Sequence, residues 1–101
     1  MAYLLKKDKR IIADIEEALS YYDAISSELG EKFESALLNA LSKIEKHPHY
    51  YFNINQKFRR INLENFPYKL LYVLIEDLKE VIVLGLFHHL KKPEEIRKRS
   101  R

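Results

Sequence analysis

Histidine, lysine and arginine side chains in the second half of the sequence could together cleave a phosphodiester without a metal ion. Such a reaction needs a base, an acid, and cations that stabilise the charge developing on the phosphate. His88 or His89 could transfer the protons, because histidine titrates near neutral pH. Arg59, Arg60 and Lys69 could bind the phosphate. His88, His89 and Lys69 are therefore the catalytic candidates.

Tyrosines near the same cations could hold nucleic acid, because aromatic rings stack on bases while arginine binds phosphate. Tyr50 and Tyr51 precede Arg59 and Arg60 by a few residues. In the alternative interpretation, such tyrosines belong to the core and one histidine of the pair only caps the end of a strand. The sequence leaves both interpretations open.

Metal and nucleotide chemistry have little support. Four histidines invite a metal hypothesis, but neighbours on a strand point to opposite faces, and no cysteine pair or helical His-x-x-x-His accompanies them. They are His47, His49, His88 and His89. The only glycines, Gly30 and Gly85, form no phosphate-binding loop and no nucleophile motif. We expect no metal site and no cofactor.

The composition bounds the class of protein. A chain of 101 residues with 47% hydrophobic content suits one domain spanning residues 1–101. The absence of cysteine suits a reducing cytoplasm. No apolar run is long enough to span a bilayer, and the start of the chain does not resemble a signal peptide. We therefore expect a cytoplasmic protein without a membrane partner.

Charge is distributed unevenly along the chain. Residues 1–50 hold 7 Lys and Arg against 9 Asp and Glu, whereas residues 51–101 hold 11 against 6. The halves therefore carry net charges of −2 and +5. The basic half could face an acidic partner or nucleic acid phosphates, or it could simply be solvated. A basic tail covers about residues 91–101, and a short helix could begin at Pro93.

Two amphipathic helices are predicted in the first half. Apolar residues at steps of three and four predict a helix from roughly Asp8 to Glu28 and another from about Glu31 to Lys46. Ser26, Ser27 and Gly30 predict a tight turn between them. His47-Pro48 ends the second helix, since proline disfavours the helical conformation in the preceding residue. The helices should form an antiparallel hairpin.

Three strand-like runs follow, and they should cover the apolar faces of that hairpin. They are Phe58 to Leu63, Tyr68 to Ile75 and Glu80 to His88, separated by turns at residues 65–67 and 76–79. Tyr3 to Leu5 could add an edge strand. The sequence thus predicts an α+β fold in which the helix hairpin packs on one face of a three- to four-stranded antiparallel sheet.

Several motifs in this layout occur together in one known group of proteins. A basic pair, Arg59-Arg60, opens the first strand, Phe66-Pro67-Tyr68 leads into a strand bearing Tyr72, and the last strand ends in His88-His89. Lys91, Lys92 and Pro93 follow, with Arg97 near the end of the sequence. The chain resembles the RelE/ParE superfamily of toxins from type II toxin-antitoxin systems, and within it the ParE-like branch. The resemblance covers nearly the whole chain.

The resemblance implies a cytoplasmic toxin held inactive by a cognate antitoxin in a hetero-oligomeric complex. RelE-like members cleave ribosome-bound mRNA, whereas ParE-like members poison DNA gyrase without cleaving RNA. Arg59, Arg60, Tyr68, Lys91, Lys92 and Arg97 would then contact nucleic acid or the target, and His88, His89 and Lys69 would serve catalysis. Cleaving members often carry a late aromatic residue, and none follows Phe87 here. That departure favours gyrase, and a non-toxic binding module is the alternative.

Overall fold

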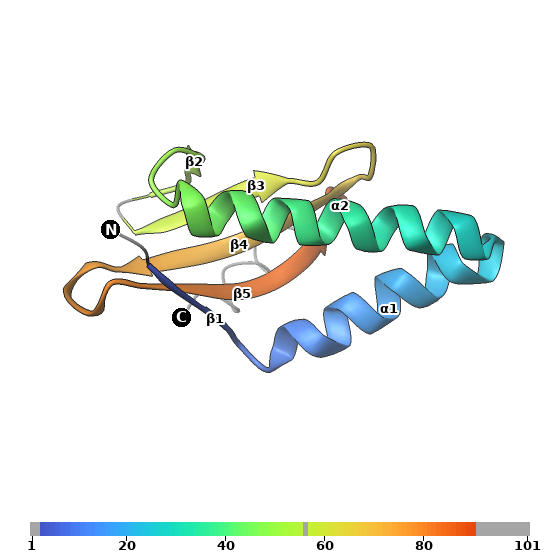
Figure 1. Ribbon diagram of the computed structural model, residues 1–101, viewed down its shortest axis with the longest axis horizontal. Helices are drawn as coiled ribbons and strands as arrows, with labels where there is room; N and C mark the ends of the chain where they lie inside the picture. The colour runs from blue at the N-terminus through green and yellow to red at the C-terminus, as the bar shows by residue number, and fades with distance from the viewer. Residues whose placement is uncertain (1–2, 56, 91–101) are drawn as a thin grey trace.

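The computed structural model describes residues 3–55 and 57–90, which fold into a sheet with two helices on one face (Figure 1). The elements, in chain order, are β1 (Leu4–Lys7), α1 (Arg10–Ile25), α2 (Ser27–Lys46), β2 (Phe52–Asn53), β3 (Phe58–Asn62), β4 (Tyr68–Ile75), the 3-10 turn η1 (Glu76–Leu78) and β5 (Glu80–His88). The predicted α+β fold is confirmed, and the last three strands lie within one residue of their predicted bounds.

The sheet differs from the prediction in strand count and in direction. It has five strands in the order β1-β5-β4-β3-β2 rather than three or four. β2 through β5 pair antiparallel, but β1 runs parallel to β5. The predicted antiparallel pairing of the last three strands is confirmed, and the possible edge strand at Tyr3 to Leu5 is present as β1, which pairs parallel. The two helices between β1 and the later strands carry the chain far enough for a parallel pairing, which a tight hairpin cannot do.

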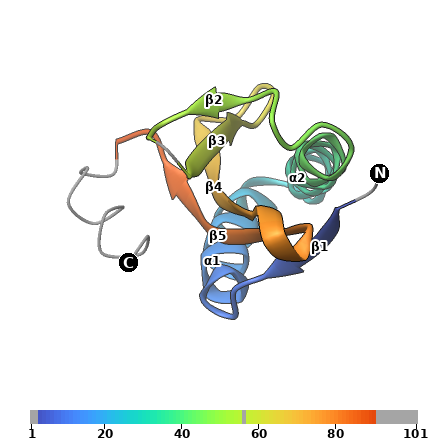
Figure 2. The ribbon, with the colours of Figure 1, turned by 90° about the vertical axis from the view of Figure 1, so that its left-hand side faces the viewer.

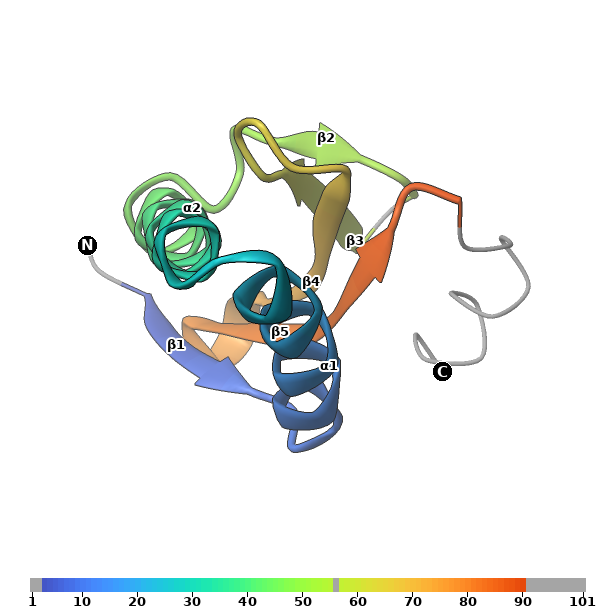
Figure 3. The ribbon, with the colours of Figure 1, turned by 90° about the vertical axis from the view of Figure 1, so that its right-hand side faces the viewer.

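Both helices lie on one side of the sheet. Figures 2 and 3 show α1 and α2 side by side against that side, with no described helix on the other. We call these the covered face and the outer face. No helix among residues 3–55 and 57–90 is long and apolar enough to cross a membrane.

The turn between the helices is shorter than predicted. α2 begins at Ser27, so only Ser26 separates it from α1, and the Ser26 hydroxyl caps α2 by accepting the Leu29 backbone N–H at 3.1 Å. Gly30 lies inside α2 rather than in a turn. A Cβ there would lie 2.5 Å from Asp23 Oδ1 and 3.2 Å from the Asp23 Cα. Glycine is thus needed for the close approach of the two helices.

Both predicted turns between strands are confirmed, and each contains a residue in the left-handed region. Asn65 has φ 67° between β3 and β4, and Lys79 has φ 54° between η1 and β5. Asparagine adopts this conformation more readily than other residues with a Cβ. These two turns set the antiparallel pairing of β3 with β4 and of β4 with β5.

The main core lies between the helices and the covered face. Ile11 and Phe33 from the helices meet Leu70, Tyr72 and Val81 from the sheet, all of them 0% exposed. An aromatic group closes the core at the end where the helices turn, with the Phe33 ring packed against Tyr22, Phe66 and Tyr68 at centroid distances of 5.1, 5.2 and 5.6 Å. The core therefore fixes how β4 and β5 are placed under the helices.

Candidate functional site

The outer face of the sheet carries a second apolar cluster. Leu71 and Val73 of β4 and Leu84 and Phe87 of β5 form its centre, and Phe58 packs beside them. The four central residues are at most 9% exposed, so this cluster is a small second core rather than a solvent-exposed patch. No described helix packs on this face (Figure 2). Polar groups that border the cluster are therefore the first candidates for contact with a target.

Two cations border this cluster at the β3 side. Arg60 stands opposite Leu71, and Lys69 stands opposite Asn62, so both side chains share the outer face. The Arg60 guanidinium lies 4.4 Å from the centroid of the Phe52 ring on β2, a cation–π contact. Partial burial and the nearby positive charge of Arg60 lower the pKa of Lys69. Arg60, predicted to bind the target, and Lys69, a catalytic candidate, are thus brought together with an exposed aromatic ring.

Arg59 has a different role, although it is adjacent to Arg60. It pairs with Tyr72 and so faces the covered side. Its Nη1 donates to the backbone carbonyls of His49 and Tyr51 at 2.8 and 2.9 Å. These bonds fix the segment between α2 and β2. A predicted phosphate-binding residue therefore holds the backbone of its own chain.

A bulge in β5 turns His88 toward the helices. Tyr72 pairs with Val83 but Leu71 pairs with Gly85, so Leu84 is an extra residue and the faces exchange beyond it. His88 consequently stands opposite Tyr68, with the rings in edge contact at 5.1 Å. Without the extra residue, alternation would place His88 on the outer face beside Lys69.

The surroundings of His88 are acidic and partly enclosed. A cavity of about 120 Å³ lies between α1 and the end of β5, and Asp14, Glu17, Tyr68 and His88 are among its lining residues. The His88 Nδ1 accepts the Leu90 backbone N–H at 3.0 Å, which fixes the orientation of the imidazole. Burial raises the pKa of Tyr68. His88 is thus oriented by structural contacts and separated by the sheet from Lys69 and Arg60.

The remaining predicted residues divide into one that is described and three that are not. His89 is exposed just after β5, and its backbone N–H donates to the Pro67 carbonyl at 2.9 Å. This bond keeps His89 at the same end of the sheet as Lys69. Lys91, Lys92 and Arg97 lie outside the described residues, as does the predicted short helix. Within residues 3–55 and 57–90, no group of three or more histidine or acidic side chains is arranged to bind a metal ion.

Sequence reasoning missed the contribution of the segment between α2 and β3. Phe52 received no role, although it packs under Arg60. Tyr72, a core residue, also donates its buried hydroxyl to the Pro48 carbonyl at 2.7 Å. Burial raises the pKa of Tyr72 to about 12. Alternation does not reveal these roles, because Arg59 shares its strand face with the apolar Ile61 and Arg60 shares its face with the apolar Phe58.

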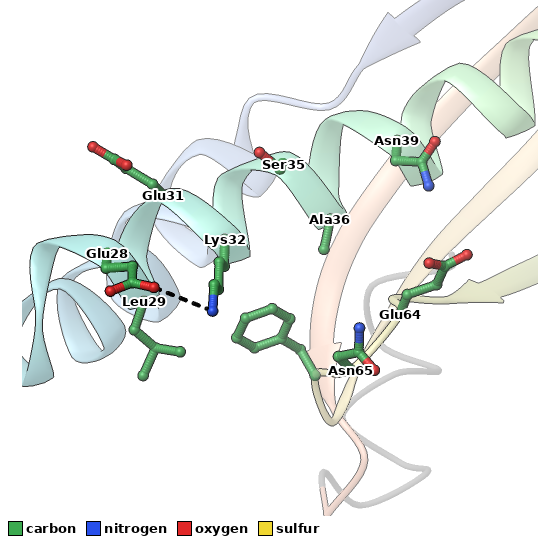
Figure 4. Close-up of a pocket in the computed structure, with 10 residues that line it drawn as sticks. Glu28, Leu29, Glu31, Lys32, Ser35, Ala36, Asn39, Glu64 and Asn65 are labelled. Carbon is green, nitrogen blue, oxygen red and sulfur yellow. Dashed lines mark ion pairs between the residues drawn. The ribbon is translucent and has the colours of Figure 1, made fainter.

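A broad groove lies apart from all of these residues. It runs between the first half of α2 and the β3–β4 turn, with a volume of about 780 Å³ (Figure 4). Leu29, Ala36 and Phe66 supply apolar surface, and Glu28, Glu31 and Glu64 make its rim acidic. Lys32 pairs with Glu28 at 3.3 Å. None of the predicted site residues lines this groove.

The comparisons with known proteins give a clear result only for structure. No model of a protein family matches the sequence, and no curated protein does so either. Among solved structures, the chromosomal ParDE toxin-antitoxin system from P. aeruginosa matches with a TM-score of 0.72 and 16% identity, over 85% of this chain and 95% of that one.

RelE structures match as well. A mutant of the E. coli toxin RelE in the free state aligns with a TM-score of 0.61 and 22% identity, over 98% of this chain and 94% of that one. The toxin-antitoxin complex RelBE of E. coli aligns with a TM-score of 0.52 and 20% identity, over 86% of this chain and 96% of that one. The two helices and the sheet described above thus form the fold of the RelE/ParE toxins.

Proposed function

We propose that this protein is the toxin of a toxin-antitoxin pair and that it inhibits bacterial growth by binding DNA gyrase. The observation that carries the proposal is the separation of the catalytic candidates. His88 packs on the covered face, Arg59 holds backbone carbonyls, and Arg60 and Lys69 border the apolar cluster of the outer face. A proton-transfer group and phosphate-binding cations must converge for catalysis, whereas two cations beside an aromatic ring suffice for binding.

The structural similarity also supports the gyrase proposal. The ParDE system gives a higher TM-score than the free RelE toxin, 0.72 against 0.61. A shared fold does not by itself identify a reaction, so the location of the candidate residues carries more weight. Both kinds of neighbour support an antitoxin as partner, since ParDE is a toxin-antitoxin system and the RelE structures include complexes of the toxin with its antitoxin.

The test is inducible expression in a bacterial host, with and without the gene that adjoins this one. We expect growth to stop, DNA damage signalling to rise before translation falls, and the adjoining gene to restore growth. Purified protein should inhibit supercoiling by gyrase in vitro. Normal growth at a good yield of folded protein would contradict the toxin role and favour the alternative, a non-toxic binding module.

A second candidate function, cleavage of ribosome-bound mRNA, is favoured by one observation. The bond from the His89 backbone to Pro67 holds His89 at the end of the sheet where Lys69 lies, and the pKa of Lys69 is lowered. A lysine with a lowered pKa is a better proton acceptor at neutral pH. Prompt loss of translation with cleaved mRNA on ribosomes, abolished by His89→Ala and by Lys69→Ala, would replace the gyrase proposal with this one.

A further inference from the structure

A pocket of about 400 Å³, the α2-end pocket, lies where the end of α2 meets the start of β1. The residues that line it are Tyr3, Lys46, His47, Pro48, His49 and Tyr50. These segments and η1 come together at the left of Figure 1. Because η1 follows the last residue of β4, the pocket lies at the other end of the sheet from Lys69. Its volume falls within the roughly 300–1,000 Å³ of small-molecule sites.

Bonds to Glu76 of η1 hold two of the lining rings in place. The Tyr3 hydroxyl donates to the Glu76 Oε1 at 2.5 Å, and the His49 Nε2 lies 2.7 Å from the Glu76 Oε2. The two rings are in edge contact at a centroid distance of 5.5 Å. The bonds from Tyr3 and His49 lower the pKa of Glu76, so its carboxylate stays ionised. Because the Nε2 of His49 is bonded to this carboxylate, its Nδ1 is left to bond a ligand.

The backbone that follows α2 is fixed as well. The Tyr72 hydroxyl donates to the Pro48 carbonyl at 2.7 Å, and the Arg59 Nη1 donates to the His49 carbonyl at 2.8 Å. Both donors come from the sheet, so the wall of the α2-end pocket is anchored to the core of the protein. A ligand that binds to an anchored wall orders little of the chain, and less conformational entropy is lost on binding.

Tyr50 supplies an aromatic surface that is open to solvent. It is 80% exposed, although its ring is in edge contact with the ring of the partly buried Tyr51 at a centroid distance of 5.1 Å. An exposed ring that is braced by a neighbour offers a face on which a nucleobase can stack. Such stacking contributes to binding and tolerates any base, because every base has a π-face.

The basic groups of the lining are one lysine and two histidines, and none of the described lining residues is acidic. Lys46, in the last turn of α2, carries a full positive charge. His47 and His49 donate hydrogen bonds as neutral imidazoles and become cationic on protonation. Such groups bind phosphate through charge-assisted hydrogen bonds. A ring for stacking and a group of phosphate donors in one pocket therefore match the two parts of a nucleotide.

We propose that the α2-end pocket binds a free nucleoside monophosphate, with the base stacked on Tyr50 and the phosphate bonded by Lys46 and His47. The His49 Nδ1, held in position by Glu76, supplies a further bond to the ligand. This site goes beyond the toxin role and does not depend on it, because the pocket lies away from the cations of the outer face that the gyrase proposal uses.

The first test is isothermal titration calorimetry of the purified full chain with adenosine 5′-monophosphate, with adenosine, and with inorganic phosphate. We expect the nucleotide to bind about tenfold more tightly than either of its parts, because it alone uses the ring and the cations together. A folded chain that binds no nucleotide would overturn the proposal. So would inorganic phosphate that binds as tightly as the nucleotide, because the base would then contribute nothing.

Two variants locate the site. Tyr50→Ser removes the stacking surface and should weaken nucleotide binding about tenfold. Lys46→Ala removes a charged partner of the phosphate and should weaken it to a similar extent. Tyr21→Ser is the matched control for the ring, because Tyr21 is 62% exposed and contacts Tyr22 at the same 5.1 Å but lies outside the pocket. Lys9→Ala is the control for the lysine, since Lys9 is also exposed and also lies outside the pocket.

The control variants should bind the nucleotide like the natural chain, and all four variants should keep its melting temperature because the substituted side chains are exposed. Equal losses of affinity for Tyr50→Ser and Tyr21→Ser would overturn the assignment of the pocket. A single-stranded oligonucleotide that binds more tightly than the nucleotide, and that loses affinity with Tyr50→Ser and Lys46→Ala, would overturn a free nucleotide as the ligand.

Discussion

The covered and outer faces of the sheet are built from the same two central strands but have different contacts. On the covered face, Tyr72 and Leu70 are fully buried under the helices. On the outer face, Leu71 and Phe87 form a smaller cluster with cations at its border. The difference shows that the apolar residues of β4 and β5 form two clusters and that cations border the outer one. The residue type alone does not say to which cluster an apolar residue belongs.

Aromatic residues on the two sides give the largest expected contrast in stability. Phe33→Ala should lower the free energy of unfolding by about 3–5 kcal/mol, because it leaves a cavity in a cluster of four rings. Phe52→Ala on the outer edge should change it by less than about 0.5 kcal/mol, because its ring is exposed. Urea denaturation of both variants measures the contrast. Equal losses would mean that the edge belongs to the core.

Tyr72→Phe tests the bond that joins the covered face to the β2 segment. Loss of the bond to the Pro48 carbonyl should cost about 1–2 kcal/mol, because that carbonyl loses a buried donor. The pKa of Tyr72 is raised from 10.0 to about 12, so its contribution is fully present below pH 10 and is lost as pH rises toward 12. Denaturation between pH 9 and 12 should therefore show a steeper decline for the natural chain than for the variant. Parallel curves would remove this role for Tyr72.

Ser26→Ala tests whether the helix hairpin depends on its single-residue turn. Removing the hydroxyl that accepts the Leu29 N–H should cost about 1 kcal/mol, the usual value for a helix cap. Ser27→Ala is the matched control, because the adjacent serine is not the cap residue. A thermal melt that shows equal shifts for the two variants would contradict the capping assignment.

Alternation predicted the strands from sequence, but it did not predict which face each candidate residue occupies. In β4 and β5 the residues on both faces are apolar, which predicts that these strands lie centrally in the sheet. The same pattern does not show which of the two faces packs against the helices. The extra residue Leu84 moves His88 to the covered face, and nothing in the sequence marks a bulge except the neighbouring Gly85. The site prediction therefore grouped His88 with Lys69, which the fold separates.

Very short strands, and strands that pair with a segment far away in the sequence, were the other source of error. β2 has only two residues, too few to give a period, and the segment before it is held by side-chain bonds from Arg59 and Tyr72 that a local pattern does not encode. The parallel pairing of β1 with β5 joins residues 4–7 to residues 80–83, a contact that local patterns do not encode. Gly30 was assigned to the turn between the helices because the sequence does not show that Asp23 of the other helix lies against it. This close approach is also a tertiary effect.

Growth after induction of three matched variants tests the central proposal, that the outer face and not a catalytic histidine acts on the target. Arg60→Ala with Lys69→Ala should restore growth, whereas His88→Ala and the exposed His89→Ala should arrest growth like the natural chain at equal levels of folded protein. Continued arrest by the Arg60→Ala, Lys69→Ala protein, or recovery with either histidine variant, would contradict the proposal.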